Sequence, residues 1–200
     1  MHVLVACEFS GVVRDAFRKR GHDAWSLDLL PTESDDPRYH IQEDVMDVLK
    51  EQKGSLVEWD WFPALKWDLI IAHPPCTAIA VSGNRWYGKD MPKHKDRKKA
   101  VKWTMNLWNL AKECGDKVCM ENPVGVLPLK PTQYIQPWEY GHGETKKTGL
   151  WLHNLDPLEP TNIVDGRDQN VWKLPPSEDR WKLRSLTFQG VADAMATQWG

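Results

Sequence analysis

Short apolar runs alternate with amphipathic segments along the first 125 residues of this chain. The apolar runs predict β-strands at residues 2–7, 23–28, 39–44, 67–72 and 117–120. Apolar side chains at helical spacing predict helices at residues 12–20, 45–53 and 96–113. Strands that alternate with helices form parallel βαβ units, so we expect an α/β protein with a doubly wound, mostly parallel sheet.

The pattern is less regular after residue 123, and eight of the fourteen prolines occur from Pro123 onward. A strand is expected at residues 149–152 and a helix at residues 186–199. No internal repeat and no low-complexity linker divides the chain. We therefore expect a single domain over residues 1–200, in which residues 126–200 complete the fold irregularly.

A basic segment contrasts with the nearly neutral chain, whose formal net charge is −2 at pH 7. Residues 83–102 contain eight Lys or Arg residues and two Asp residues. Such a segment can bind the phosphates of a nucleic acid, and it can equally form a solvated loop and helix face. The chain also has twelve tryptophans, which indicates that some indoles are exposed and able to stack on bases.

The four cysteines, at positions 7, 76, 114 and 119, show no paired Cys-x-x-Cys spacing. We recognise no signal sequence and no apolar run near 18 residues. We therefore expect a cytoplasmic protein with reduced thiols and no contact with a membrane. Cys114 and Cys119 have no nearby histidine at zinc-site spacing, so we expect them to be structural and no metal to be bound.

Polar residues follow several of the predicted strands, and in an open parallel sheet ligands bind at the carboxyl ends of the strands. These residues are Glu8, Asp28, Asp44, Cys76 and Glu121. Gly11 would allow the backbone of the first loop to approach a cofactor closely. Asp28, at the end of the second strand, is suited to accept hydrogen bonds from a ribose diol.

The most informative segment is residues 67–77, where a buried strand is followed by two prolines and then by Cys76. A rigid Pro-Pro turn at the end of a strand suits a nucleophile, because it holds the side chain in one place. A thiolate can add to carbon 6 of a pyrimidine, and a carboxylic acid such as Glu121 can take up the charge that develops at ring nitrogen 3. Carbon 5 then attacks a sulfonium methyl. Singly, such residues are more often an inert buried thiol and a surface carboxylate, but their joint occurrence after separate strands favours catalysis.

These residues resemble the motifs of the S-adenosylmethionine-dependent DNA cytosine-5 methyltransferases, with a match over residues 1–125. Glu8-Phe9-Ser10-Gly11 is similar to the family's first cofactor motif, and Asp28 matches the acid at the end of its second strand. Asp44-Val45 is similar to its adenine-binding pair. Pro74-Pro75-Cys76 corresponds to the nucleophile motif, and Glu121-Asn122 to the motif whose glutamate contacts the cytosine ring.

The resemblance implies a class I, Rossmann-like methyltransferase fold and methyl transfer from S-adenosylmethionine to carbon 5 of cytosine in DNA. It implies Cys76 and Glu121 as catalytic residues. The residues implied at the cofactor are Glu8, Phe9, Ser10, Gly11, Asp28, Asp44, Val45 and Pro74. Those expected at the substrate are Pro75, Arg85, Trp86, Lys89, Asn122, Lys146 and Lys147.

The chain departs from the family's pattern at several positions. Val13 and Arg14 stand where small residues are usual, His73 stands in place of a glycine, and Thr77 in place of a glutamine. In the family's base-contacting motif, Lys146 or Lys147 would replace arginines. The segment 189–192 faintly echoes the closing helix that completes the cofactor pocket.

No stretch of the chain is long enough for a target recognition domain, as in compact forms from phage and prophage genomes. A protein partner could supply the reading of DNA sequence, or the enzyme could favour unpaired DNA, in which flipping a base costs less. The cellular setting would be the cytoplasm of a bacterium or of a phage-infected host. The basic segment begins seven residues after Cys76, where the family carries a mobile loop that closes over the flipped base.

Three alternatives remain for the function. The same chemistry on a free pyrimidine nucleotide would explain the short chain, but eight basic residues favour a polymer over a single phosphate. A non-catalytic phage protein that binds DNA or the cofactor would tolerate loss of Cys76 and Glu121, yet both are present. An amino-group methyltransferase would carry an Asp/Asn-Pro-Pro-aromatic turn, which residues 73–76 fit poorly.

Overall fold

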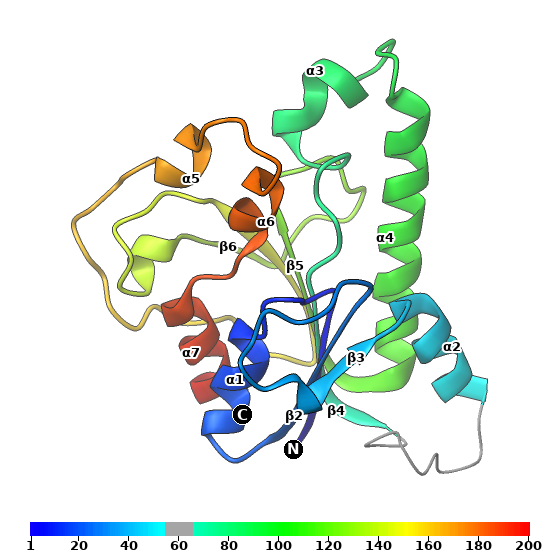
Figure 1. Cartoon of the computed structure of the whole chain (residues 1–200), viewed down its shortest axis with the longest axis vertical. Helices are drawn as coiled ribbons and strands as arrows, with labels where there is room; N and C mark the ends of the chain where they lie inside the picture. Colours follow the sequence, from blue (N-terminus) through cyan, green and yellow to red (C-terminus); the bar gives the residue numbers. More distant parts are fainter. Residues whose placement is uncertain (55–65) are drawn as a thin grey trace.

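The apolar runs of the sequence form the strands of one β-sheet in the computed structural model of the chain, which describes residues 1–54 and 66–200. Within these residues the sheet has seven strands in the order β3-β2-β1-β4-β5-β7-β6, with helices on both faces (Figure 1). The strands are β1 (His2–Ala6), β2 (Asp23–Asp28), β3 (His40–Gln42), β4 (Trp67–Ala72), β5 (Gly115–Pro123), β6 (Gln133–Ile135) and β7 (Thr148–His153). The helices are α1 (Val12–Lys19), α2 (Val45–Gly54), α3 (Asn84–Tyr87), α4 (His94–Cys114), α5 (Asn170–Lys173), α6 (Arg180–Ser185) and α7 (Gln189–Gln198).

The strands β1 to β5 run parallel to one another, whereas β7 is antiparallel to both β5 and β6. The expected α/β fold with a mostly parallel, doubly wound sheet is therefore confirmed. The chain moves outward from β1 to β2 and β3 and then returns to β4 on the other side of β1, and ligands bind at this kind of reversal point. The loops after β1 and β4 begin side by side, because the His73 N–H donates to the Ala6 carbonyl at 2.9 Å.

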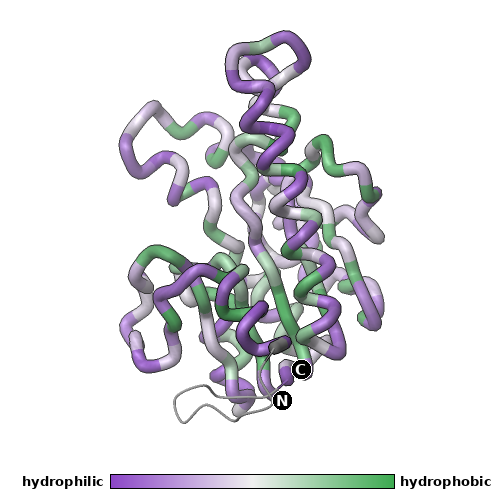
Figure 2. The backbone as a smooth tube through the Cα atoms, turned by 90° about the vertical axis from the view of Figure 1, so that its right-hand side faces the viewer, coloured by the Kyte–Doolittle hydropathy of each residue, from purple (hydrophilic) through white to green (hydrophobic). Residues whose placement is uncertain are grey.

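Both faces of the sheet are covered by helices, with α1 and α7 on one face and α2 and α4 on the other (Figure 1). Val5 of β1 packs in one core cluster with Phe17 of α1 and Met195 of α7. Its neighbour Leu4 points to the opposite face and packs with Leu107 of α4. Because both faces of the sheet are buried at its centre, the central strands β1 and β4 are mostly apolar, and hydrophobic backbone lies inside the molecule in Figure 2.

Two glycines are required by close packing around the helices. Gly11, directly before α1, has φ +74°, and a Cβ there would lie 2.7 Å from the Cβ of Ser34. Gly190 lies in α7, and a Cβ at this position would lie 1.9 Å from the carbonyl oxygen of Tyr140. Any larger residue at either position would displace the backbone or side chains packed against it.

Each strand and helix expected from the sequence is present, and the sequence did not predict β6 or the short helices α3, α5 and α6. One prediction is wrong. Glu121 and Asn122 do not follow the fifth strand but lie within β5, opposite Leu150 and Gly149 of β7. The physical reason is that the antiparallel partner β7 continues the hydrogen-bond ladder to Pro123, beyond the apolar residues that marked the strand.

All four cysteines carry free thiols. No helix in the described part of the chain combines the length and the apolar character needed to cross a bilayer.

Candidate active site

Hydrogen bonds before, within and after the turn that carries Cys76 fix its position. Before the turn, His73 is hydrogen-bonded to the end of β1. Within it, the carbonyl of Pro74 accepts a hydrogen bond of 2.8 Å from the Asn122 side-chain amide, which reaches across from β5. After it, the Cys76 carbonyl accepts from the N–H groups of Ile79 and Ala80, at 3.0 and 2.8 Å. The half-buried Cys76 is therefore fixed at the carboxyl edge of the sheet.

Glu121 lies on β5 beside this turn and is paired with a histidine. Its Oε2 is 3.0 Å from Nδ1 of His73, and both side chains are nearly buried, with 13 % and 10 % of their surface exposed. Burial by itself would raise the pKa of the Glu121 carboxyl. The hydrogen bond and positive charge of His73, the charge of Lys146 and a hydrogen bond from Thr148 outweigh burial and lower this pKa below its ordinary value. Glu121 is thus a carboxylate at neutral pH in the free protein.

The thiol of Cys76 shares this neighbourhood. Burial raises the pKa of Cys76, and the negative charge of Glu121 raises it further. The positive charges of Lys146 and Arg184 act in the opposite direction. Each of these charges acts on the thiol, and the hydrogen bonds from the turn 73–76 to Glu121 and Asn122 hold Cys76 beside β5. The two residues expected to be catalytic therefore lie at one place, with two cations beside them.

Replacement of Lys146 should make the Cys76 thiol less reactive. We expect Lys146→Ala to raise the pKa of Cys76 further, because the variant loses a cation that stabilises the thiolate. Alkylation by iodoacetamide at pH 8, followed by mass spectrometry of the Cys76 peptide, should be several-fold slower than in the wild type. Lys147→Ala is the matched control, since the Lys147 ammonium lies 4.4 Å from the ring centroid of Tyr134 and does not act on the thiol. Equal rates in both variants would contradict the electrostatic assignment.

Two carboxylates lie at the adjoining strand ends, where the cofactor was expected. Burial raises the pKa of the Cys7 thiol after β1, and the charges of Asp28 and Asp44 raise it further, so both carboxylates are near this thiol. Oδ1 of Asp28 accepts from the Leu30 N–H at 2.9 Å, and Oδ1 of Asp44 accepts from the Met46 N–H at 2.7 Å at the start of α2. Neither carboxylate forms an ion pair with any residue that the structure describes. This edge therefore offers acceptors for hydroxyl and amino groups.

The first loop, residues 8–11, is folded tightly on itself. The buried Glu8 carboxylate accepts from the N–H groups of Val13 and Arg14, at 2.7 and 3.2 Å, and so caps the start of α1. The Ser10 hydroxyl donates to the same carboxylate at 3.4 Å. The Phe9 carbonyl accepts hydrogen bonds from the Thr32 hydroxyl at 3.0 Å and from the Glu33 N–H at 2.8 Å. The Phe9 side chain is buried. The side chains of Glu8 and Ser10 therefore stabilise the backbone conformation of this loop.

Two further residues expected at the cofactor, Val45 and Pro74, are buried. Val45 packs in the core cluster with residues of α4. In the Asp44-Val45 pair, only the Asp44 side chain therefore offers polar atoms to a ligand. Pro74 contributes its carbonyl to the hydrogen bond with Asn122. Oδ1 of Asn122 is buried and has no hydrogen-bond partner among the described residues.

The basic segment after Cys76 is not wholly available to a phosphate, because Arg97 of α4 is buried. Its guanidinium donates to the carbonyls of Ala78 and Ala80, at 2.7 and 3.2 Å, and to the Asn84 side chain at 2.7 Å. The loop folds back over the start of α4, where its carbonyl groups need donors once water is excluded. Arg97 therefore supports the loop and, of the eight basic residues of segment 83–102, is the one that is buried.

We expect Arg97→Ala to destabilise the protein and the loop after Cys76. The change removes the donor to the Ala78 carbonyl and to the Asn84 side chain, and leaves the Ala80 carbonyl with only the Gly83 N–H as a donor among the described residues, so the free energy of unfolding in urea should fall by about 2–3 kcal/mol. The adjacent Lys98 is exposed, and Lys98→Ala should change this free energy by no more than about 0.5 kcal/mol. Similar losses in both variants would mean that Arg97 does not support the loop.

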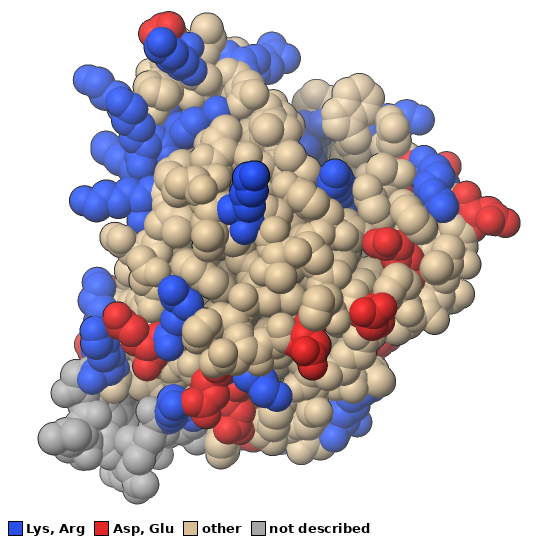
Figure 3. Space-filling view, turned by 180° about the vertical axis from the view of Figure 1, so that it is seen from behind, with Lys and Arg blue, Asp and Glu red and all other residues tan. Residues whose placement is uncertain are grey.

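The other basic residues of this segment are exposed, and Figure 3 shows Lys and Arg side chains gathered at the end of the molecule that carries α3 and the start of α4. They are Arg85, Lys89, Lys93, Lys95, Lys98, Lys99 and Lys102. Trp86 is 52 % exposed beside them, and the guanidinium carbon of Arg85 lies 5.0 Å from its ring centroid. Among the residues expected at the substrate, Pro75 and Lys147 are also exposed, while Lys146 is half-buried and donates to the Leu186 carbonyl at 3.0 Å.

Sequence reasoning missed helix α6, which links the two halves of the site. The indole of Trp181 lies 6.0 Å from the ring of Phe9, centroid to centroid, and Lys182 forms a 3.0 Å ion pair with Glu33. Arg184, three residues after Trp181, is one of the two cations that act on Cys76. The only available signal was the basic and aromatic composition of residues 180–184, because the helix is too short for a clear apolar period.

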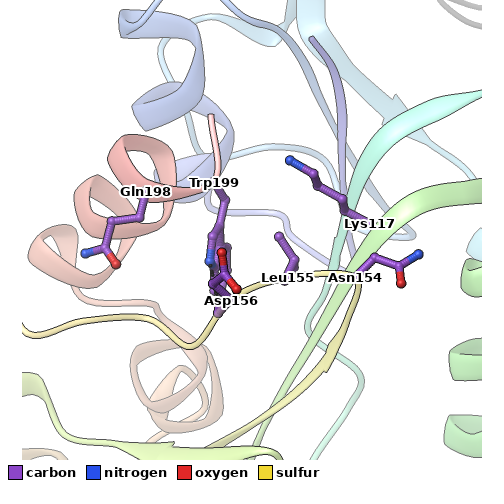
Figure 4. A pocket seen from close by; sticks show the side chains of 6 residues that line it. All are labelled: Lys117, Asn154, Leu155, Asp156, Gln198 and Trp199. Atoms are coloured by element: carbon purple, nitrogen blue, oxygen red, sulfur yellow. Dashed lines mark hydrogen bonds between the residues drawn. The ribbon is translucent and has the colours of Figure 1, made fainter.

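A pocket of about 300 Å³ lies at the opposite edge of the sheet from Cys76 (Figure 4). It is formed at the beginning of β5, after β7 and at the end of the chain, by Lys117, Asn154, Leu155, Asp156, Gln198 and Trp199. The Trp199 indole N–H donates to the Asp156 carbonyl at 3.1 Å. In the described residues no group of three or more His, Cys, Asp or Glu side chains is arranged to hold a metal ion.

Comparison of the chain with protein-family models and with curated protein sequences finds no match in either.

Proposed function

We propose that this protein transfers a methyl group from S-adenosylmethionine to carbon 5 of cytosine in DNA. The observation that carries the proposal is that the turn 73–76, which holds Cys76, is hydrogen-bonded to Glu121 and Asn122 of β5 at one edge of the sheet. At the same edge of the sheet, the carboxylates of Asp28 and Asp44 lie at the ends of β2 and β3. The strand order is compatible with the class I methyltransferase fold that the sequence resemblance implies.

The cofactor would lie at the ends of β1, β2 and β3. Asp28 would accept hydrogen bonds from the ribose hydroxyls, since burial raises the pKa of its carboxyl and diol donors would compensate its charge. Asp44 would accept from the adenine amino group, and the loop 8–11 would border the rest of the molecule. When bound, S-adenosylmethionine supplies an electrophilic methyl group on a positively charged sulfur.

The protein's own part in the chemistry begins with the Cys76 sulfur, which as a thiolate would bond to carbon 6 of the base. Lys146 and Arg184 favour this thiolate, because their positive charges lower the pKa of Cys76. Glu121 would contact ring nitrogen 3 and stabilise the charge that moves there as the sulfur adds. Asn122 would keep the Pro-Pro turn in place through its hydrogen bond to Pro74.

The exposed Lys and Arg side chains around α3 and the start of α4 favour a nucleic acid as the substrate. Arg85 and Lys89 would hold phosphates that flank the target, and the exposed Trp86 would stack on or beside a base. The target base must leave the helix stack to reach Cys76, which costs a few kcal/mol in a duplex and less in a single strand. We therefore expect unpaired or distorted DNA to be the better substrate.

The test offers S-adenosylmethionine labelled in its methyl group together with duplex DNA, single-stranded DNA or dCMP. Label in 5-methylcytosine of DNA, at a several-fold higher rate in the single strand, would support the proposal. Label in dCMP alone would support a nucleotide-modifying enzyme instead. Cofactor binding without transfer to any of the three would contradict an enzymatic function.

A further inference from the structure

His73 lies at the centre of the candidate active site, between two acidic residues. Its Nδ1 is 3.0 Å from Oε2 of Glu121 on β5. Its positive charge also acts on the buried Glu8, which follows β1, and lowers the pKa of that carboxyl against the raising effect of burial. Nε2 of His73 is buried and has no hydrogen-bond partner in the described part of the chain. A half-satisfied histidine at this depth is unusual for a purely structural residue.

Glu121 alone cannot supply the proton that the proposed chemistry needs. Ring nitrogen 3 of cytosine is a hydrogen-bond acceptor, and a carboxylate is one too, so the two repel unless a proton lies between them. Glu121 is a carboxylate at neutral pH, because its pKa is lowered by its surroundings, above all by His73. The proton must therefore come from a group next to Glu121, and His73 is the group that is hydrogen-bonded to it.

We propose that His73 is a positioning residue for Glu121, which it holds through Nδ1 and to which, as an imidazolium, it supplies the proton that reaches ring nitrogen 3. This inference rests on the proposed function, since it concerns a step in the same reaction. It assigns a role to a side chain at the position where the resembling family has a glycine. The chemistry at this site is therefore expected to depend on a histidine of this chain's own.

The proton and electron changes balance within the pair and the base. As the Cys76 sulfur forms its bond to carbon 6, an electron pair moves through the ring to nitrogen 3. The bond from Nδ1 to hydrogen breaks, the proton crosses the Glu121 carboxyl, and a new bond from nitrogen 3 to hydrogen forms. His73 is then neutral and Glu121 is again a carboxylate. As carbon 5 bonds to the methyl group, the carbon 4–nitrogen 3 double bond re-forms and nitrogen 3 returns its proton to the pair. A water molecule then takes the proton from carbon 5, and the electrons of that C–H bond form the carbon 5–carbon 6 double bond as the Cys76 thiolate leaves.

Several other charged or titratable groups face this pair and enter its pH dependence. They are Glu8 after β1, Cys76 after β4, Cys119 on β5 and Lys146 before β7, with Arg184 of α6 acting on Cys76. Because the step needs a thiolate and a shared proton at the same time, we expect a bell-shaped profile for the single-turnover rate.

The test uses His73→Asn, because the Asn amide can still donate to Glu121 but cannot carry a titrating proton. We expect the rate at pH 7.5 to fall about 10–100-fold and the pH profile to lose its dependence on the shared proton. Binding of S-adenosylmethionine should change less than two-fold. His153→Asn, at the end of β7, is the matched control and should keep the wild-type profile.

Two further results separate this inference from the proposed function. A ¹⁵N spectrum of the wild-type protein should show a proton on Nδ1 of His73, and a neutral ring protonated only at Nε2 would overturn the inference without any turnover being measured. An unchanged pH profile in active His73→Asn would overturn it as well. Absence of transfer from wild-type protein to any cytosine substrate would instead contradict the proposed function.

Discussion

Cys76→Ala is expected to abolish methyl transfer, with a fall in rate of at least about four orders of magnitude. The reason is that no other group at the site can bond to carbon 6 of the base. Of the other free thiols, Cys119 is fully buried within β5, Cys114 is buried at the end of α4, and Cys7 lies after β1 beside the carboxylates expected at the cofactor. The measurement is transfer of labelled methyl to single-stranded DNA in single turnover.

A covalent adduct provides the direct readout for this variant. An oligonucleotide with 5-fluorocytosine should trap the wild-type protein, because the fluorine at carbon 5 cannot leave as a proton does. Mass spectrometry should locate the adduct on Cys76 and find none in Cys76→Ala. The matched control is Cys114→Ala, which removes a buried thiol whose hydrogen bond goes to the Leu49 carbonyl, away from the site. Retained transfer in Cys76→Ala, or an adduct on another cysteine, would refute the nucleophile assignment.

The order of elements was predictable from the sequence because the apolar runs are short, continuous and separated by amphipathic helices. Burial of both faces of β4 leaves no polar residue between Leu69 and Ala72, which is the pattern of a central parallel strand. The antiparallel end of the sheet was harder to predict. β6 has three residues, and α5 and α6 have four and six, so none carries a full period of its own.

The sequence indicated which residues belong to the site better than it indicated which residues contact one another there. His73 and Glu121 are 48 residues apart, and only the pairing of β4 with β5 brings them together. In the sequence His73 is merely a departure from a motif. Arg97 looked like one more cation in a basic segment, since nothing local indicates that carbonyls of residues 78 and 80 fold back onto its guanidinium. Spacing along the chain identifies candidate groups, whereas their partners depend on strand register and loop path.

Glu121→Gln should lower the rate of methyl transfer by about 10²–10³-fold at saturating cofactor, because the amide cannot deliver a proton to ring nitrogen 3. Binding of S-adenosylmethionine, measured by calorimetry, should change less than two-fold. Asp28→Asn should give the reverse result. Its cofactor dissociation constant should rise about 10–100-fold through loss of a charged acceptor, with a nearly normal rate at saturation. The same defect in both variants would contradict this division between base and cofactor.

Glu121→Gln should also change the reactivity of the Cys76 thiol, in the direction opposite to its effect on methyl transfer. In the wild type the charge of Glu121 raises the pKa of Cys76, so its removal should lower that pKa and increase the fraction of thiolate at pH 8. Alkylation of Cys76 by iodoacetamide should therefore become faster while methyl transfer becomes slower. A variant that had merely lost its local structure would not be expected to separate the two rates in this way. Slower alkylation together with slower transfer would mean that Glu121 acts on the nucleophile and not on the base.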